Sequence, residues 1–329
     1  MVQASVKYTT SSKDISALNP LCKALGDPLR IEILKVLQKD AFGVLELCSI
    51  FNIGQPAMSH HLKVLSKNSL VSTRRDGTNI FYQRNNVQPM KNLQNFHCEI
   101  FETINKFKLE IGTKRNIQKI KKMRENASIK FFNNNASLFK ENQDLIASWS
   151  NYGDSIISLL QRYQISGALA FDIGTGLGAF LPKMCSLFKS VIAIDNAKKI
   201  IKECENRMAE HNLTNVAFRK GDTNNLKEYL DQVDFIALNM VLHHNPDPLK
   251  IIKDCATALS ANGYLLITEL CSHEQEWAKK SCGDFWLGFE PDTIKVWTES
   301  MQMKKMESVF INQRNGFKTQ IHIFTKYKD

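Results

Sequence analysis

The sequence predicts two unlike domains, a mainly α-helical N-terminal domain with a β-hairpin and a C-terminal α/β domain built on a doubly wound parallel sheet. The length of 329 residues suits two domains. Residues 1–140 carry 22 Lys+Arg against 10 Asp+Glu, whereas residues 141–329 carry 21 against 23. All the excess positive charge therefore lies in the first part. This charge favours a polyanionic partner over a basic surface that serves only solubility. Nucleic acid is the first candidate partner and an anionic membrane surface the second.

The first elements of the N-terminal part are predicted helices. Apolar residues recur at three- and four-residue spacing between Leu21 and Phe51. Asn52-Ile53-Gly54 interrupts this pattern, and a further helix is expected from about Gln55 to Leu65. We expect its apolar residues Met58, Leu62 and Leu65 to face inward. Its polar residues would then lie on the open side: Gln55, Ser59, His60 and Lys63.

A basic β-hairpin follows this helix. Two predicted strands between Ser72 and Arg84 flank Asp76-Gly77, a dipeptide typical of tight turns. Helix, turn, helix and hairpin together describe a winged helix-turn-helix, whose second helix fits the major groove of DNA. We expect Arg74, Arg75 and Asn79 of the hairpin to contact phosphates or the minor groove.

Over Leu18–Asn85 the sequence resembles the ArsR-type family of bacterial winged-helix repressors. Three segments carry the resemblance: Leu25-Gly26-Asp27-Pro28-Leu29-Arg30, the run Ser59–Leu65, and the hairpin Arg74–Arg84. It implies a protein that binds double-stranded operator DNA. Helices flanking the winged unit would pair two protomers into a homodimer, matching a two-fold operator.

No metal site is predicted, although many relatives of this type sense metals. Thiolate sensors carry Cys-x-Cys where this chain has Cys48-Ser49-Ile50, and one soft ligand makes no closed site. His60 and His61 are an alternative ligand pair, but neighbouring helical residues point in different directions. His97 has no second ligand set at convincing spacing.

The most informative segment of the C-terminal part runs from Ala168 to Asp195. An apolar strand leads into Asp172-Ile173-Gly174-Thr175-Gly176-Leu177-Gly178, then a helical segment, then a second strand, Val191–Ile194, that ends at Asp195. This is the layout of a nucleotide site at the edge of a parallel sheet. Asp195 is placed to accept hydrogen bonds from ribose hydroxyls, so the chain is predicted to bind an adenosine-containing ligand.

Three features favour S-adenosylmethionine over a dinucleotide, although Gly174-x-Gly176-x-x-Ala179 also fits the relaxed NAD(P) pattern. Asp172 precedes the glycines and can face an amino group. A third strand from Val216 ends in Gly221-Asp222, and a fourth, Val233–Leu238, runs into Asn239. The predicted cofactor residues are Asp172, Gly174, Thr175, Gly176, Gly178, Asp195, Asn196, Asp222, Thr223 and Asn239.

From about Phe131 onward the chain resembles the class I S-adenosylmethionine-dependent methyltransferases, with their Rossmann-like sheet. A helix to about Ser260, a fifth strand Tyr264–Glu269 and a hairpin across Asn315-Gly316 match the antiparallel end of that sheet. The segment Glu276–Pro291 resembles one found in methyltransferases fused to ArsR-type domains. S-adenosylhomocysteine would be the product.

His243 and His244 follow the fourth strand and are the candidate bases for a small-molecule methyl acceptor, with ordering of the loop as the alternative role. Cys271 and Cys282 do not reproduce the cysteine set of arsenite methyltransferases. We therefore expect a regulator with a catalytic methyltransferase domain. The rival is a transcription factor that only senses S-adenosylmethionine or S-adenosylhomocysteine.

The expected division is 1–87 for the winged domain, 88–143 for a helical dimerisation or linker region, and 144–329 for the methyltransferase domain. No signal pattern and no bilayer-spanning apolar run is present, and the eight cysteines lack C-x-x-C pairs. We therefore expect a cytoplasmic protein without a membrane partner.

Overall fold

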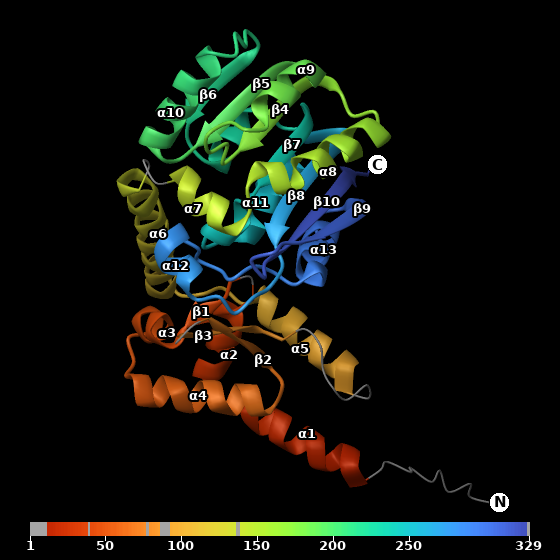
Figure 1. The fold of residues 1–329 in the computed structure, drawn as a ribbon. Helices are drawn as coiled ribbons and strands as arrows, with labels where there is room; N and C mark the ends of the chain where they lie inside the picture. Colours follow the sequence, from red (N-terminus) through yellow and green to blue (C-terminus); the bar gives the residue numbers. More distant parts are fainter. Residues whose placement is uncertain (1–11, 39, 77–78, 86–92, 136–138, 328–329) are drawn as a thin grey trace, which may run out of the picture. The chain divides into compact units, whose positions relative to one another are not determined.

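The computed structural model describes residues 12–38, 40–76, 79–85, 93–135 and 139–327. It divides the chain into two compact units, Met1–Ile120 and Lys121–Asp329. The boundary falls inside the stretch 88–143 that was expected to form a separate connector. Helix α6 (Ile111–Asn134) runs through that boundary (Figure 1).

Packing explains why the division differs from the expected one. Phe101 and Ile104 are buried in the hydrophobic core of the N-terminal unit, and Ile117 and Ile120 pack against that core. Asn116 also donates a hydrogen bond to Ile50 O (3.0 Å). The first part of the expected connector therefore completes the N-terminal core, and the rest belongs to the C-terminal unit.

The N-terminal unit combines helices with a small antiparallel sheet in the order β1-β3-β2. Asp27 caps α2 by accepting the Arg30 N–H (3.1 Å), and Pro28 occupies the first helical position. The elements of this unit, up to the boundary helix, are α1 (Ser12–Leu25), α2 (Pro28–Val36), β1 (Phe42–Gly43), α3 (Val44–Phe51), α4 (Gln55–Lys67), β2 (Val71–Asp76), β3 (Asn79–Arg84) and α5 (Gln94–Lys106).

The β2–β3 hairpin confirms the two predicted basic strands. Asp76 pairs with Asn79, so the two connecting residues are 77 and 78, which lie outside the described residues. Arg84, at the end of β3, is buried and donates to Leu34 O (3.2 Å) and to Asn105 Oδ1 (2.9 Å). This arginine holds the hairpin against α2 and α5 rather than facing solvent.

The C-terminal unit confirms the doubly wound sheet with an antiparallel end. Its seven strands run in the order β6-β5-β4-β7-β8-β10-β9, parallel from β6 to β8, with β10 antiparallel to both neighbours. The strands are β4 (Gly167–Ile173), β5 (Phe188–Asp195), β6 (Val216–Lys220), β7 (Val233–Asn239), β8 (Leu259–Leu270), β9 (Met303–Asn312) and β10 (Lys318–Lys326).

Alternating side chains of these strands bury both faces of the sheet. Ala170 and Phe235 join one core cluster with Ile156 and Met184 from the helices, while Phe171 and Ile236 are fully buried on the other face. None of the described helices is both long and apolar enough to span a membrane. The helices are α7 (Phe139–Ile146), α8 (Trp149–Arg162), α9 (Leu181–Leu187), α10 (Lys198–Ala209), η3 (Thr223–Glu228), η4 (Leu242–His244), α11 (Pro248–Ala258), α12 (Trp277–Cys282) and α13 (Pro291–Glu299).

Candidate functional site

The glycine loop lies where the strand order reverses, between β4 and β7, which is the usual ligand position in an open α/β sheet. The N–H groups of Gly174 and Thr175 donate to Ile194 O (2.8 and 3.0 Å), which ties the loop to β5. Gly174 has a φ of +67°, and a Cβ there would lie 2.6 Å from Val241 Cγ2. Only glycine therefore fits at this position.

Two cavities open at this edge of the sheet and share Gly174 in their walls. We call them the β5-side cavity, of about 290 Å³, and the β4-side cavity, of about 380 Å³. All predicted cofactor residues except Gly178 line one or the other. The β5-side cavity contains Asp195, Asn196, Asp222 and Thr223, and the β4-side cavity contains Asp172, Thr175, Gly176 and Asn239.

Gly178 instead lies where the glycine loop packs closely against α10. Its φ is +77°, and a Cβ there would lie 2.7 Å from Cys204 Sγ on α10. The close approach of loop and helix therefore requires glycine at this position, although it lines neither cavity.

The two acids of the β5-side cavity are held by backbone N–H groups. Asp195 accepts from Ala197 (2.8 Å) and Gly176 (3.3 Å), and burial raises its pKa to about 6. Asp222 caps η3 by accepting the Asn224 N–H (2.6 Å). A carboxylate has about four lone-pair positions, so both keep acceptor capacity toward a ligand in the cavity.

The β4-side cavity holds polar groups that match a cationic ligand. Asp172 is 2% exposed and accepts from Thr175 Oγ1 (2.7 Å). Burial, with a smaller contribution from the charge of Asp195, raises the pKa of Asp172 to about 7. The side-chain amide of Asn239 is buried without a hydrogen-bond partner among the described residues. Leaving such atoms unpaired costs about 1–3 kcal/mol each, which favours a ligand that pairs with them.

The two candidate bases differ in their surroundings. His243 Nδ1 lies 2.6 Å from Glu269 Oε2. Burial alone would lower the pKa of His243, but the charges of Glu269 and Asp284 outweigh it and raise the pKa to about 9. Burial and the charge of His243 lower the pKa of His244 well below its ordinary value. His244, which lines the β5-side cavity, is therefore neutral at pH 7.

Several cavity residues were missed by the sequence reasoning because they lie on helices before the first strand of the sheet. Lys121, Glu125, Ser128 and Phe132 of α6 line the β5-side cavity. Their spacing of three and four residues places them on one face of a helix, which was the available signal. Trp149 and Tyr152 of α8 line the β4-side cavity in the same way.

Helix α4 in the N-terminal unit has the two faces expected from the sequence. Met58, Leu62 and Leu65 are fully buried. The residues predicted to contact DNA on this helix are all exposed: Gln55, Ser59, His60 and Lys63.

The hairpin residues of the predicted DNA contact are less completely described. Arg74 on β2 is half-buried, and the side chains of Arg75 and Asn79 lie outside the described residues. The ring centroids of His60 and His61 lie 6.0 Å apart, with the ring planes at 76° to each other.

Residues 27–73 match the model of the "Bacterial regulatory protein, arsR family". The arsenical resistance operon repressor of Staphylococcus xylosus is 41% identical over 68 residues, which cover 21% of this chain and 65% of the repressor. The transcriptional repressor SdpR of Bacillus subtilis is 35% identical over 68 residues, 21% of this chain and 76% of its own length. The chain belongs to the arsR family.

Joined to this arsR-family domain is a methyltransferase domain, whose model matches residues 166–314. The ubiquinone biosynthesis O-methyltransferase of Xanthomonas campestris pv. campestris is 32% identical over 110 residues, 33% of this chain and 46% of that enzyme. The structure of the [4+2]-cyclase SpnF shares the fold, with a TM-score of 0.51 and 12% identity over 61% of this chain and 95% of the cyclase.

These matches divide the site residues of the arsR-family protein into two groups. The methyltransferase match contains every predicted cofactor residue and both histidines. The cavity residues of α6 and α8 lie outside both matched ranges.

Proposed function

We propose that this arsR-family protein binds operator DNA as a homodimer in the cytoplasm, and that its second domain binds S-adenosylmethionine and transfers a methyl group to a small molecule. The observation that carries the proposal is the pair of cavities sharing Gly174 at the switch point of the sheet. One contains acids suited to an adenosine, and the other contains a carboxylate and an unpaired amide suited to an amino acid.

The chain's own residues would bind and orient the donor. Asp195 would accept hydrogen bonds from the ribose hydroxyls and Asp222 one from the adenine amine. Asp172 would face the ammonium of the amino acid, and Asn239 would pair its amide with polar atoms of the ligand. S-adenosylmethionine supplies an already electrophilic methyl group, so the protein mainly places the acceptor in line and excludes water.

His244 is the better of the two candidate bases for an acceptor hydroxyl or carbon acid. Its ring is neutral near pH 7 and borders the β5-side cavity. His243, whose pKa is raised to about 9, holds its proton near neutrality and pairs with Glu269. We assign His243 the role of ordering the loop through its contact with Glu269, and His244 the role of accepting the proton of the methyl acceptor.

Calorimetry with S-adenosylmethionine, S-adenosylhomocysteine and NAD⁺ tests the donor assignment. We expect micromolar or tighter binding of the first two and none of NAD⁺. Asp195→Ala should weaken binding by about 1–3 kcal/mol, because the ribose hydroxyls lose their acceptor. Glu228→Ala, at an exposed residue of η3, is the matched control and should leave affinity unchanged. Preference for NAD⁺, or no binding of either sulfur ligand, would refute the proposal.

A further inference from the structure

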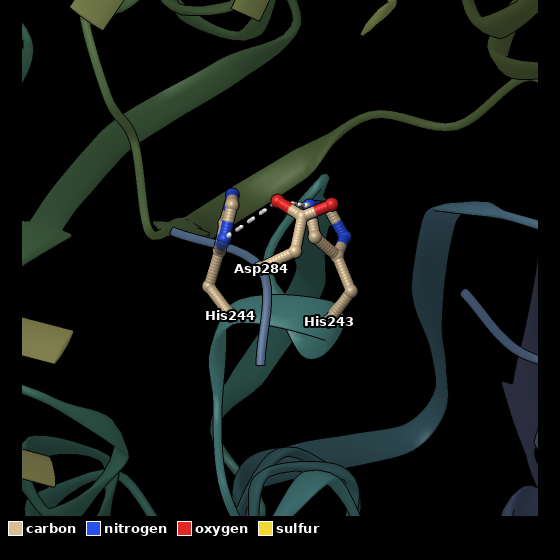
Figure 2. A group of neighbouring side chains, drawn as sticks. All are labelled: His243, His244 and Asp284. Atoms are coloured by element: carbon tan, nitrogen blue, oxygen red, sulfur yellow. Dashed lines mark ion pairs between the residues drawn. The ribbon is translucent and has the colours of Figure 1, made fainter. Parts of the chain in front are cut away.

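Two imidazoles and a carboxylate converge beside the β5-side cavity. His243 and His244 lie in η4, and Asp284 follows α12. Asp284 Oδ1 lies 3.5 Å from His244 Nδ1 and 3.8 Å from His243 Nε2, and one ligand atom of each residue lies within 4.8 Å of the others. Figure 2 shows the Asp284 carboxylate between the two rings.

The two segments that supply these side chains are fastened together by backbone hydrogen bonds. The N–H groups of Phe285 and Trp286 both donate to His243 O (2.8 and 2.9 Å). The Trp286 indole donates to Asn245 O (2.8 Å). Asp284 is thus held opposite the histidine pair by hydrogen bonds from the two residues that follow it, which preorganises the three side chains.

Glu269 orients His243 from the opposite side. Its Oε2 lies 2.6 Å from His243 Nδ1, while its Oε1 accepts the N–H of Leu242 (2.6 Å) and of His243 (3.3 Å). A carboxylate on one ring nitrogen fixes the tautomer and directs the other nitrogen outward, the arrangement found behind metal-binding histidines. Here it directs His243 Nε2 toward Asp284.

We propose that His243 Nε2, His244 Nδ1 and Asp284 bind one divalent transition-metal ion such as Zn²⁺ or Fe²⁺. Ligand atoms at about 2.0–2.1 Å from a tetrahedral ion lie roughly 3.4 Å apart, close to the two separations to Asp284. Two imidazoles with one carboxylate select such ions over Mg²⁺ or Ca²⁺. A cavity of about 20 Å³ adjoins both histidines, and the rest of its lining is Ile146, Ala147, Met240 and Cys282.

An ion with three protein ligands keeps a position open for another molecule. Because His244 also lines the β5-side cavity, a group entering from that side can reach the open position. In this respect the inference rests on the proposed function: the ion would bind the hydroxyl oxygen of the methyl acceptor and lower the pKa of that hydroxyl, so that its proton would pass to water before the methyl group is transferred. His244 would then act as a ligand instead of accepting the acceptor's proton. Its Nδ1, which lies 3.3 Å from Gly283 O and donates to it in this structure, would give up that hydrogen bond, and the ring would carry its proton on Nε2.

Metal titration of the full-length protein after chelator treatment tests the site without any methyl donor. We expect calorimetry to show one Zn²⁺ or Co²⁺ per chain, and each ion to raise the Tm. Asp284→Asn and His243→Gln should each weaken binding at least tenfold. Glu269→Gln should weaken it by about 10–100-fold, because it removes the group that orients His243.

His322→Gln is the matched control, because His322 is also buried in this unit but pairs with Ser308 and Gln320 instead. It should retain one ion per chain. The metal site would be overturned if the wild-type protein bound no ion. It would also be overturned if Asp284→Asn and His243→Gln bound the ion as tightly as the wild-type protein does. S-adenosylhomocysteine binding, measured on the same samples, reports separately on the proposed donor function.

Discussion

Asp172 shows how burial of a single carboxyl ties protonation to ligand binding. Its pKa rises from the ordinary 3.8 to about 7 because burial disfavours the charged form. Between these pH values the folded, unliganded protein keeps a proton that the unfolded chain has lost. The contribution of Asp172 to stability therefore declines as pH rises from about 4 to about 7.

We predict that S-adenosylhomocysteine binds more tightly as pH rises to about 7 and that its affinity then levels off. Its ammonium requires the Asp172 carboxylate, so binding below pH 7 must release a proton. The proton of Asp172 contributes at most about a tenfold change in affinity per pH unit, and Asp195, whose pKa is about 6, adds to the slope at lower pH. Calorimetry in buffers of different ionisation enthalpy counts the released protons.

Asp172→Asn is the diagnostic variant for this prediction. It should remove the slope between pH 6 and 7 while leaving the smaller effect of Asp195, whose pKa is about 6. An unchanged slope in Asp172→Asn would assign the titration to another group.

Helix α4 and the β2–β3 hairpin are the two elements through which the N-terminal unit would contact DNA. The polar residues of α4 are exposed on the face opposite its buried stripe, as base readout in a major groove requires. The hairpin contributes Arg74 and Arg75, whose charges suit phosphates. These two kinds of contact differ in their dependence on salt and on base sequence.

We predict that Arg74→Ala and Arg75→Ala weaken binding to all operator variants alike and reduce the salt slope, because phosphate contacts release counterions and carry no base identity. Gln55→Ala and Ser59→Ala should instead change which operator variants are preferred, by about 1–3 kcal/mol at the base concerned. Affinities over a panel of inverted repeats at several salt concentrations separate the two. Identical profiles for both classes of variant would contradict these roles.

At the scale of the whole molecule, α6 is the element that both units use. Its early residues Ile117 and Ile120 pack against the N-terminal core, and its later residues, from Lys121 to Phe132, line the β5-side cavity. Lys121 also pairs with Asp247 at that cavity (2.8 Å). A ligand that changes the position of the later residues would therefore act on a helix whose beginning belongs to the DNA-binding unit.

We predict that S-adenosylmethionine and S-adenosylhomocysteine change operator affinity by different factors, with coupling of about 1–3 kcal/mol. The coupling must be reciprocal, so operator DNA should change ligand affinity by the same factor. Operator titrations at saturating concentrations of each ligand measure it. If the operator titration curves were identical with S-adenosylmethionine, with S-adenosylhomocysteine and without ligand, the two domains would act independently.

Local patterns in the sequence were sufficient to predict both folds and to select residues that line the two cavities. Glycines that need positive φ, an acid at the end of a strand, and a helix with a buried stripe are each defined within a few neighbouring residues. Gly174 and Asp195 on the β5-side cavity and Asp172 on the β4-side cavity illustrate this. So does the exposed face of α4.

Only the tertiary structure decided which distant residues complete the sites. Asp284 lies 40 residues from His244 and reaches it through main-chain contacts of the following loop, which no local pattern records. The charged face of α6 resembles a solvated spacer in sequence, yet it lines a cavity because α6 packs beside the sheet edge. The charges of Glu269 and Asp284 raise the pKa of His243, whereas burial and the charge of His243 lower the pKa of His244. Burial and partners act through space, so two identical neighbours in sequence acquired different chemistry.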